Sequence, residues 1–204
     1  HDPFTNAVKA MEKTFVHRIE GVDHQLWNPT GGVDYHTQLQ SIVRRGPDVV
    51  YVDDVSEPGT GKVVSSPTAS DTRFYVTLPV DGIGPAITEW FRAVGDVKLA
   101  AAPLRGVVAV RMVRKLCLAC RVGFQPSPEQ AKRLAIPPGK AVELFRAGGK
   151  VQIKSKVEDC PMCKGSGFSG LVGVFEVLPL DEEARGHLAK GDLKSAYNAA
   201  RMKM

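Results

Sequence analysis

The four cysteines of this 204-residue chain form two pairs, Cys117 with Cys120 and Cys160 with Cys163. Two residues between paired cysteines let both thiolates face one cation from a tight turn, and two such pairs complete a tetrahedral set. Glycines soon after the second pair allow the positive φ angles that such turns need. The sequence therefore predicts one closed metal site. We expect structural zinc there, although a mononuclear iron ion suits the same ligands.

Two other interpretations of the cysteines are a pair of redox CxxC motifs and two structural disulfides, but the paired spacing favours a metal. The second pair, with Gly165 and Gly167, also resembles the CxxCxGxG turn of DnaJ-type chaperones. That family repeats the turn four times, and the segment after Cys120 does not supply the second glycine. Because no cysteine is left over for disulfides, we expect a reducing, cytoplasmic location.

Composition places the chain among ordinary globular proteins, with 43% hydrophobic and 24% charged residues. The net charge of +5 is compatible with a phosphate, nucleic-acid or acidic-lipid partner and selects none of them. The longest apolar run, residues 99–113, is interrupted by Pro103, Arg105 and Arg111, which excludes a membrane span. At this length the chain holds one large or two small domains.

Residue patterns predict alternating strands and helices. Strands are expected at residues 6–12, 49–52, 73–80 and 172–175, with a hairpin over 16–27 and a loop over 58–70. Helices are expected at 34–45, 83–94, 98–116, 141–145, 181–188 and 190–202, and one more begins after the N-cap Ser127 and ends before Pro137.

The apolar strand at residues 49–52 is followed at once by Asp53 and Asp54. This pattern is typical of a Walker B site, where carboxylates at a sheet edge hold Mg²⁺ or a water molecule against a phosphate. An aspartate after a strand is also a common turn former or helix cap. A nearby Gly-Thr-Gly-Lys run ending at Lys62 does not make a P-loop, because Ser56 and Val63 stand where that motif needs Gly and Ser or Thr.

Several segments together resemble the traffic ATPases, the hexameric motors of type II secretion and type IV pilus assembly. The most specific are the Arg-Lys-Leu-Cys-x-x-Cys passage ending at Cys120 and the Gly-rich run after Cys163. The resemblance implies a RecA-like ATPase sheet whose P-loop and following helix lie upstream of His1. It also assigns Glu12 to the Asp box, Asp54 to the catalytic acid position, and Asp53 and Arg44 to the nucleotide site.

The chain departs from the family at positions that serve catalysis. Lys13 stands where the Asp box has its aspartate, and Asp53 and Asp54 replace a Gly-Glu pair. Thr72 and Pro79 replace two histidines of the His box, and Gln40 replaces one of two arginines that serve phosphates. Asp is one methylene shorter than Glu, and a misplacement of about 1 Å costs on the order of a hundredfold in rate. These changes indicate a pseudo-ATPase with an intact scaffold.

We therefore expect an α/β fold: a partial RecA-like domain over residues 1–116, a tetracysteine zinc subdomain over 117–170 and a helical C-terminal region over 171–204. The missing strand would leave a sheet edge for a partner to cover. The expected function is a secretion or pilus motor component, degenerate in hydrolysis; ATP and Mg²⁺ are expected only with the upstream segment. The alternatives are a non-catalytic scaffold or regulator and, third, a zinc-ribbon nucleic-acid binder. Expected partners are further copies in a ring or inner-membrane secretion proteins, with peripheral membrane association and no DNA or RNA.

Overall fold

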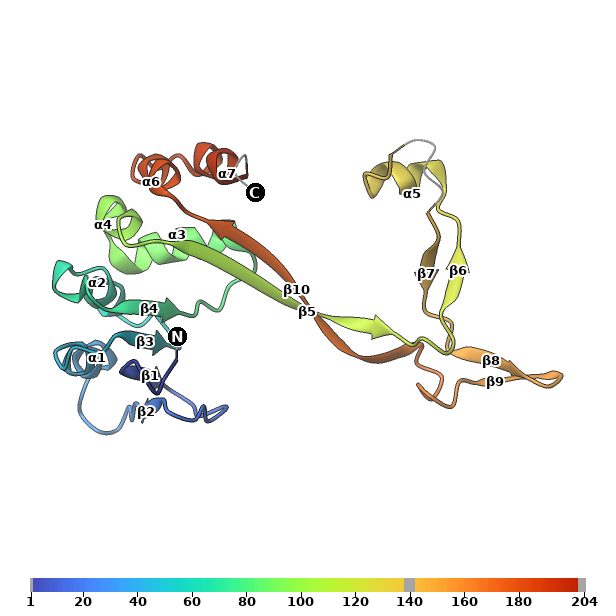
Figure 1. Cartoon of the computed structure of the whole chain (residues 1–204), viewed down its shortest axis with the longest axis horizontal. Helices are drawn as coiled ribbons and strands as arrows, with labels where there is room; N and C mark the ends of the chain where they lie inside the picture. The colour runs from blue at the N-terminus through green and yellow to red at the C-terminus, as the bar shows by residue number, and fades with distance from the viewer. Residues whose placement is uncertain (1, 138–141, 202–204) are drawn as a thin grey trace. The chain divides into compact units, whose positions relative to one another are not determined.

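The computed structural model describes residues 2–137 and 142–201, which fall into two compact units (Figure 1). Unit 1 takes in the described parts of His1–Ala109 and Glu176–Met204, and unit 2 is Val110–Phe175. The boundaries fall inside two long, mutually hydrogen-bonded strands, β5 (Gly106–Leu116) and β10 (Phe168–Pro179). The boundaries of the two units therefore differ from the expected domain boundaries at residues 116 and 170, because each of these strands contributes to both units.

Unit 1 contains a four-stranded sheet in the order β2-β1-β3-β4, and all of its strands are parallel. The strands are β1 (Val8–Glu12), β2 (Asp23–Leu26), β3 (Val49–Val52) and β4 (Arg73–Val76). Parallel pairing brings the carboxyl ends of the strands to one edge. The chain passes from β1 to β2 on one side and then to β3 on the other, so the carboxyl ends of β1 and β3 flank a topological switch point, where open α/β sheets bind ligands.

Four helices complete the core over this sheet: α1 (Tyr35–Val43), α2 (Thr60–Val64), α3 (Ile83–Val94) and α4 (Val97–Ala101). Tyr35, Leu39 and Ile42 project from one face of α1 at helical spacing and pack with strand residues such as Val50 and Val52. Within the described residues β4 has a strand neighbour only on its β3 side. Among the described helices, none is both long and apolar enough to cross a bilayer.

The last two helices, α6 (Glu182–Leu188) and α7 (Leu193–Arg201), belong to unit 1. A second buried cluster joins them to α3 through residues that include Ile83, Ile87, Leu188 and Ala196. These helices are short and bury small and apolar side chains against α3. They therefore do not form the separate C-terminal region that was expected over residues 171–204.

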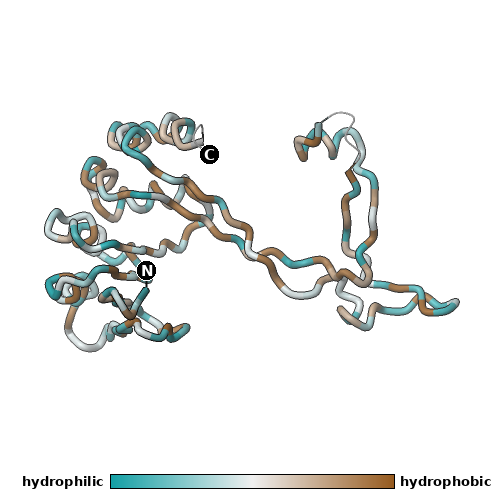
Figure 2. The backbone as a smooth tube through the Cα atoms, in the orientation of Figure 1, coloured by the Kyte–Doolittle hydropathy of each residue, from teal (hydrophilic) through white to brown (hydrophobic). Residues whose placement is uncertain are grey.

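Unit 2 is built from short antiparallel pairs, β6 (Val122–Phe124) with β7 (Leu144–Arg146) and β8 (Lys150–Ile153) with β9 (Lys156–Asp159). Its helix α5 (Pro128–Arg133) begins at a complete capping box between Ser127 and Gln130, as the sequence predicts. Figure 2 shows hydrophobic residues along β5 and β10, and several are exposed. A two-stranded ribbon has too few layers to cover both of its faces.

The predicted hairpin over residues 16–27 is wrong. Only Asp23–Leu26 is a strand, and it pairs in parallel with β1 rather than with the segment before it. Lys9 on β1 forms an ion pair with Asp23 at 2.7 Å, and Glu12 contacts His24. The turn at Glu20 and Gly21 does form, but the contacts with β1 decide which strand residues 23–26 pair with.

The predicted loop over residues 58–70 contains α2 and the 3₁₀ turn η1 (Pro67–Ala69). Glycine and β-branched residues are poor helix formers, so local propensity argues against a helix here. Burial overrides it, because Gly61, Val63 and Val64 are all buried and α2 lies against α3. Such short helices depend on tertiary packing rather than on propensity.

Two predicted helices contain strands. Residues 98–116 form the end of α4 and then β5, because Pro103 stops the helix and alternating β-branched residues follow it. Residues 144–146 form β7, which pairs with β6; Ala141, where that helix was expected to begin, lies outside the described residues. In both places an extended partner strand decides the conformation.

Candidate functional site

The carboxyl ends of β1 and β3 bring four acidic residues close together: Glu12, Asp53, Asp54 and Glu57. We call this group the carboxylate edge. Glu12 is the last residue of β1, and Asp53 and Asp54 directly follow β3, as expected for parallel neighbours. The arrangement places three of the predicted site residues in one region. Glu57 joins them through the turn after β3.

Asp53 ties three elements together. One of its oxygens accepts a hydrogen bond from the backbone N–H of Lys13, and the other accepts from the hydroxyl of Tyr35 at 2.6 Å. Tyr35 lies at the start of α1 and is buried. Burial, together with the hydrogen bond to Asp53, raises the pKa of Tyr35 above its usual range. Both oxygens of Asp53 therefore serve the fold.

Lys13 and Ser56 donate hydrogen bonds to the carboxylate of Asp54. Its Oδ2 lies 2.8 Å from Lys13 Nζ, and its Oδ1 accepts from the backbone N–H of Ser56 at 2.9 Å and from the Ser56 hydroxyl. Burial by itself raises the pKa of Asp54, but the hydrogen bonds from Lys13 and Ser56 outweigh it and lower that pKa. Asp54 is therefore a weakly basic carboxylate at neutral pH.

Glu12 is buried beside His24 of β2. The Nδ1 of His24 lies 2.7 Å from Glu12 Oε2, and its Nε2 accepts from the backbone N–H of Ile19 at 3.1 Å. An Nε2 that accepts leaves Nδ1 to carry the proton in the neutral ring, so the imidazole donates to Glu12. Glu12 thus fixes a histidine and, through it, the chain segment that leads into β2.

Arg44 and Thr72 lie near the amino ends of the strands, away from the carboxylate edge. Arg44 caps the C-terminal end of α1, which leads to the amino end of β3, whereas the carboxylates follow its carboxyl end. Thr72 precedes β4, and its hydroxyl donates to the carbonyl of Pro47 at 2.9 Å. Pro79 follows β4 and is exposed. Within this chain, the structure does not bring Arg44 to the acidic residues.

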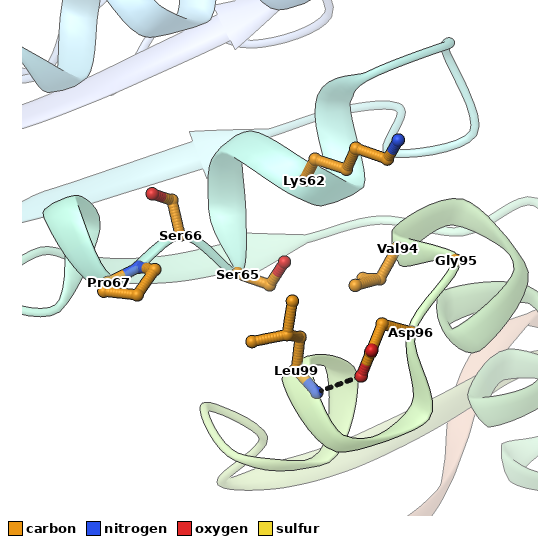
Figure 3. A pocket seen from close by; sticks show the side chains of 8 residues that line it. All are labelled: Lys62, Ser65, Ser66, Pro67, Val94, Gly95, Asp96 and Leu99. Carbon is orange, nitrogen blue, oxygen red and sulfur yellow. Dashed lines mark hydrogen bonds between the residues drawn. The ribbon is translucent and has the colours of Figure 1, made fainter.

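A cavity of about 390 Å³ lies between α2 and the junction of α3 with α4 (Figure 3). Two of its polar side chains already bind helix backbone: Asp96 accepts from the N–H of Leu99 at 2.9 Å, and Ser65 donates to the carbonyl of Gly61 at 2.8 Å. The carboxylate edge does not line it. This cavity is therefore a crevice between packed helices rather than part of the predicted site.

All four cysteines are buried, and one Sγ from each lies within 4.8 Å of the others. All four cysteines are free, and two of the sulfur pairs, Cys120 with Cys163 at 3.6 Å and Cys117 with Cys160 at 3.9 Å, are far longer than a disulfide of about 2.05 Å. The disulfide interpretation is therefore wrong. The tetracysteine cluster (Cys117, Cys120, Cys160 and Cys163) has the composition and spacing of a metal site.

Backbone amides on glycine turns face the cluster from both sides. Gly149 donates its N–H to Cys120 Sγ at 3.3 Å, and Gly167 donates to Cys163 Sγ at 3.2 Å. Both glycines have φ angles near +80°, which a residue with a Cβ adopts only with strain. The expectation that glycine shapes the second turn is confirmed at Gly165 and Gly167.

The pKa values of two thiols in the cluster are shifted in opposite directions. Burial raises the pKa of Cys120 to about 12. Burial has the same tendency at Cys163, but the N–H of Gly167 and the neighbouring thiols outweigh it and lower the pKa of Cys163 to about 7. Four thiolates so close together would repel one another strongly, so full ionisation of the cluster needs a bound cation.

Comparison with known proteins identifies the family. The family described as type II/IV secretion system protein matches residues 5–204. The chain belongs to the type II/IV secretion system protein family. This confirms the resemblance to the secretion and pilus traffic ATPases.

Relatives of this family member include the type IV pilus assembly ATPase PilB of Thermus thermophilus and the type II secretion system protein E of Dickeya dadantii. PilB is 25% identical over 185 residues, which are 90% of this chain and 20% of PilB. Protein E is 26% identical over 195 residues, which are 96% of this chain and 36% of that protein. The chain therefore spans a fifth to about a third of these relatives.

Solved structures of two ATPases share the fold. DotB of Legionella pneumophila superposes with a TM-score of 0.53 at 13% identity, over 96% of this chain and 42% of DotB. The pilus retraction motor PilT gives 0.54 at 11% identity, over 96% of this chain and 45% of PilT. At this identity the likeness supports the mixed α/β, RecA-like architecture alone.

Sequence reasoning missed three side chains at the carboxylate edge of this family member: Tyr35, His24 and Glu57. Tyr35 lies in the predicted helix over residues 34–45, with no predicted contact to Asp53, and His24 lies in the predicted hairpin over residues 16–27, which does not form. The alternation of His24 and Leu26 after Asp23 is a weak strand signal, and parallel pairing with β1 cannot be read from it. Glu57 lies three residues beyond Asp54, a spacing that a tight turn brings together.

Proposed function

We propose that this chain is part of a traffic ATPase of a type II secretion or type IV pilus system, and that the whole protein hydrolyses ATP poorly. Family membership and the RecA-like sheet support the first half of the proposal. The second half rests on the state of Asp54, which occupies the position of the family's catalytic acid. The remaining length of the relatives would supply the rest of the nucleotide site.

The ion pair between Lys13 and Asp54 carries this proposal. A general base must be free to accept a proton and must have a pKa near the working pH. The pKa of Asp54 is lowered, and three hydrogen bonds from Lys13 and Ser56 engage both of its oxygens. Its side chain is also one methylene shorter than Glu. Asp54 is therefore poorly suited to prepare an attacking water molecule.

The test is phosphate release by the full-length protein with Mg-ATP, comparing wild type, Asp54→Asn and Asp54→Glu. We expect slow release that Asp54→Asn changes less than about twofold, because the carboxylate contributes little to the rate. Calorimetry should detect no tight Mg-ATP binding by the 204-residue chain alone. Rapid turnover that Asp54→Asn abolishes would overturn the proposal and make Asp54 a working catalytic residue.

A scaffold or regulator that never hydrolyses ATP is the second candidate, and the same Lys13–Asp54 ion pair favours it. Such a protein would assemble with its secretion or pilus partners without turnover. Sedimentation of the full-length protein, with and without nucleotide, separates the two. A scaffold should form the same ring in both conditions. A motor component should instead need ATP to assemble into a ring, or should assemble at a different rate when ATP is present.

We also propose that the tetracysteine cluster holds one structural zinc ion. The four buried sulfurs fit a closed tetrahedral site, and the amides of Gly149 and Gly167 stabilise thiolate charge. With all four positions taken by protein, the ion would organise unit 2 and leave no position for a substrate. Elemental analysis should find one zinc per chain, and iron in its place would correct the identity of the metal.

The expected partners are further copies of the protein in a ring, or inner-membrane proteins of the secretion or pilus machinery. The expected location is the cytoplasm, with peripheral attachment at the inner membrane. Among the described residues β4 has a strand neighbour only on its β3 side, which supports a contact there with another segment or copy. We expect no DNA or RNA binding, and salt-sensitive binding to either would contradict this.

A further inference from the structure

The amino group of Lys13 lies between Asp54 and Glu57. Its Nζ is 2.8 Å from Asp54 and also contacts Glu57, and all three side chains are about 20 to 30% exposed. The rings of Trp27 and Tyr35 lie 5.9 and 5.8 Å from the same nitrogen. The side chain is therefore held by two carboxylates and two aromatic faces, which is more than a surface ion pair offers.

The backbone also fixes Lys13 in this place. Lys13 directly follows β1, and its N–H donates to Asp53, which in turn accepts from Tyr35. Strand β1 is central in the sheet, with β2 on one side and β3 on the other. Lys13 therefore leaves the sheet at a fixed point, beside the carboxylates that follow β3.

We propose that Lys13 is a built-in cation that occupies the space between Asp54 and Glu57 and keeps this pair of carboxylates from binding a divalent metal ion. Two close carboxylates at the carboxyl edge of a parallel sheet are ligands that Mg²⁺ and Mn²⁺ accept. The ammonium of Lys13 already takes a hydrogen-bonding position on each of them. A divalent ion would have to displace it from both at once.

The ammonium does not leave by losing its proton near neutral pH. Burial lowers the pKa of Lys13, but the hydrogen bonds to Asp54 and Glu57 outweigh it, and the pKa stays above its ordinary value. Lys13 is thus a positioning residue whose charge acts through the two carboxylates. This inference shares the Lys13–Asp54 ion pair with the proposal on ATP hydrolysis, but its test uses no nucleotide, so a failure of one can be told from a failure of the other.

The experiment is a titration of the chain with Mn²⁺ in the absence of nucleotide, followed by electron paramagnetic resonance. The variants are Lys13→Met, Asp54→Asn and the double variant, with Lys9→Met as the matched control. Lys9 lies on β1, which Lys13 directly follows, and it pairs with Asp23 rather than with the carboxylate edge. The control therefore removes the same charge from the same short stretch of chain.

We expect Lys13→Met to bind one more Mn²⁺ ion per chain than wild type. The dissociation constant of this added site should be at least tenfold lower than that of any Mn²⁺ binding by wild type at Asp54 and Glu57. Lys9→Met should gain no site, and the double variant should lose the site gained by Lys13→Met. The proposal is overturned if Lys13→Met gains nothing while its circular dichroism matches wild type. It is also overturned if wild type already binds a Mn²⁺ ion that Asp54→Asn removes.

A measurement on the wild-type chain covers the case in which Lys13→Met fails to fold. Nitrogen-15 labelled lysine allows the side-chain ammonium of Lys13 to be followed by nuclear magnetic resonance. We expect a signal protected from exchange by its two ion pairs, and unchanged in millimolar Mg²⁺. A saturable shift or loss of that signal with Mg²⁺ would show that the ion displaces Lys13, and would refute the proposal.

Discussion

At the scale of single residues, the hydroxyl of Tyr35 links α1 to the end of β3 through Asp53. Replacing Tyr35 with Phe removes a buried donor from a charged acceptor and should cost about 1.5 to 3 kcal/mol of unfolding free energy. Urea denaturation measures this. Tyr51→Phe is the control, because its hydroxyl contacts Thr77 at 3.1 Å in an exposed position, and it should cost less than about 0.5 kcal/mol. Equal losses would mean that Asp53 does not depend on Tyr35.

At low pH, protonation of Asp54 should lower the stability of the folded protein. Because its pKa is lowered in the folded state, its contribution to stability is complete above the unfolded-state pKa of about 3.9 and is lost as the pH falls through the lower folded-state pKa. The free-energy difference between wild type and Asp54→Asn should therefore be constant near neutral pH and shrink below about pH 4. Urea denaturation from pH 7 to pH 2.5 measures it. A difference independent of pH would contradict the ion pair with Lys13.

At the scale of elements, Gly61 allows α2 to approach α3. A Cβ on Gly61 would lie 2.6 Å from the backbone carbon and oxygen of Ala93, so one of the two helices would have to move. We expect Gly61→Ala to cost about 1 to 3 kcal/mol, although alanine is the better helix former.

Gly186 in α6 is the matched control for Gly61, because a Cβ there would meet no atom within 4 Å. Gly186→Ala should therefore raise stability by about 0.5 to 1 kcal/mol. Thermal denaturation of both variants measures the two changes, which should have opposite signs. A stabilising Gly61→Ala would show that α2 does not pack closely on α3.

At the scale of the whole molecule, the two units should respond differently to loss of metal. The two buried apolar clusters of unit 1 contain no cysteine, whereas the buried cluster of unit 2 consists of the four cysteines. Because we propose that metal binding and folding are coupled in unit 2, a zinc chelator should unfold unit 2 and leave unit 1 folded.

Hydrogen exchange, measured segment by segment, tests this difference between the two units. Amides of β8 and β9, and those of Gly149 and Gly167, should lose protection on chelation, while those of β1 and β3 keep it. Cys163→Ser should give the same pattern without a chelator. Uniform loss of protection across both units would show that unit 1 needs the metal as well.

The sequence was most informative where a pattern has a local physical cause. The helix over residues 83–94 was predicted with its observed bounds because Ile83, Ile87, Trp90 and Val94 recur at helical spacing and Gly95 ends it. The capping box at Ser127 likewise acts within four residues. The predicted helix over residues 83–94 and the predicted N-cap at Ser127 were confirmed, because the contacts that decide these elements lie close together in the chain.

Predictions failed where distant contacts decide the conformation. Residues 106–116 were predicted as part of a helix over residues 98–116, yet they pair with β10 (Phe168–Pro179). Residues 60–64 are poor helix formers that become helical against α3. The partner of each segment is separated from it by many residues, and local propensity contains no information about that partner.

The sequence by itself determined the family, the α/β alternation, the acidic end of β3 and the tetracysteine set, because each is a matter of which residues stand at fixed short spacings. Only the tertiary structure decided how these parts act. Parallel pairing of β1 with β3 placed Lys13 against Asp54 and Glu57, and the packing of α1 on the sheet placed Tyr35 against Asp53. The reason is geometric: charges more than forty residues apart interact only when a sheet brings their strand ends together.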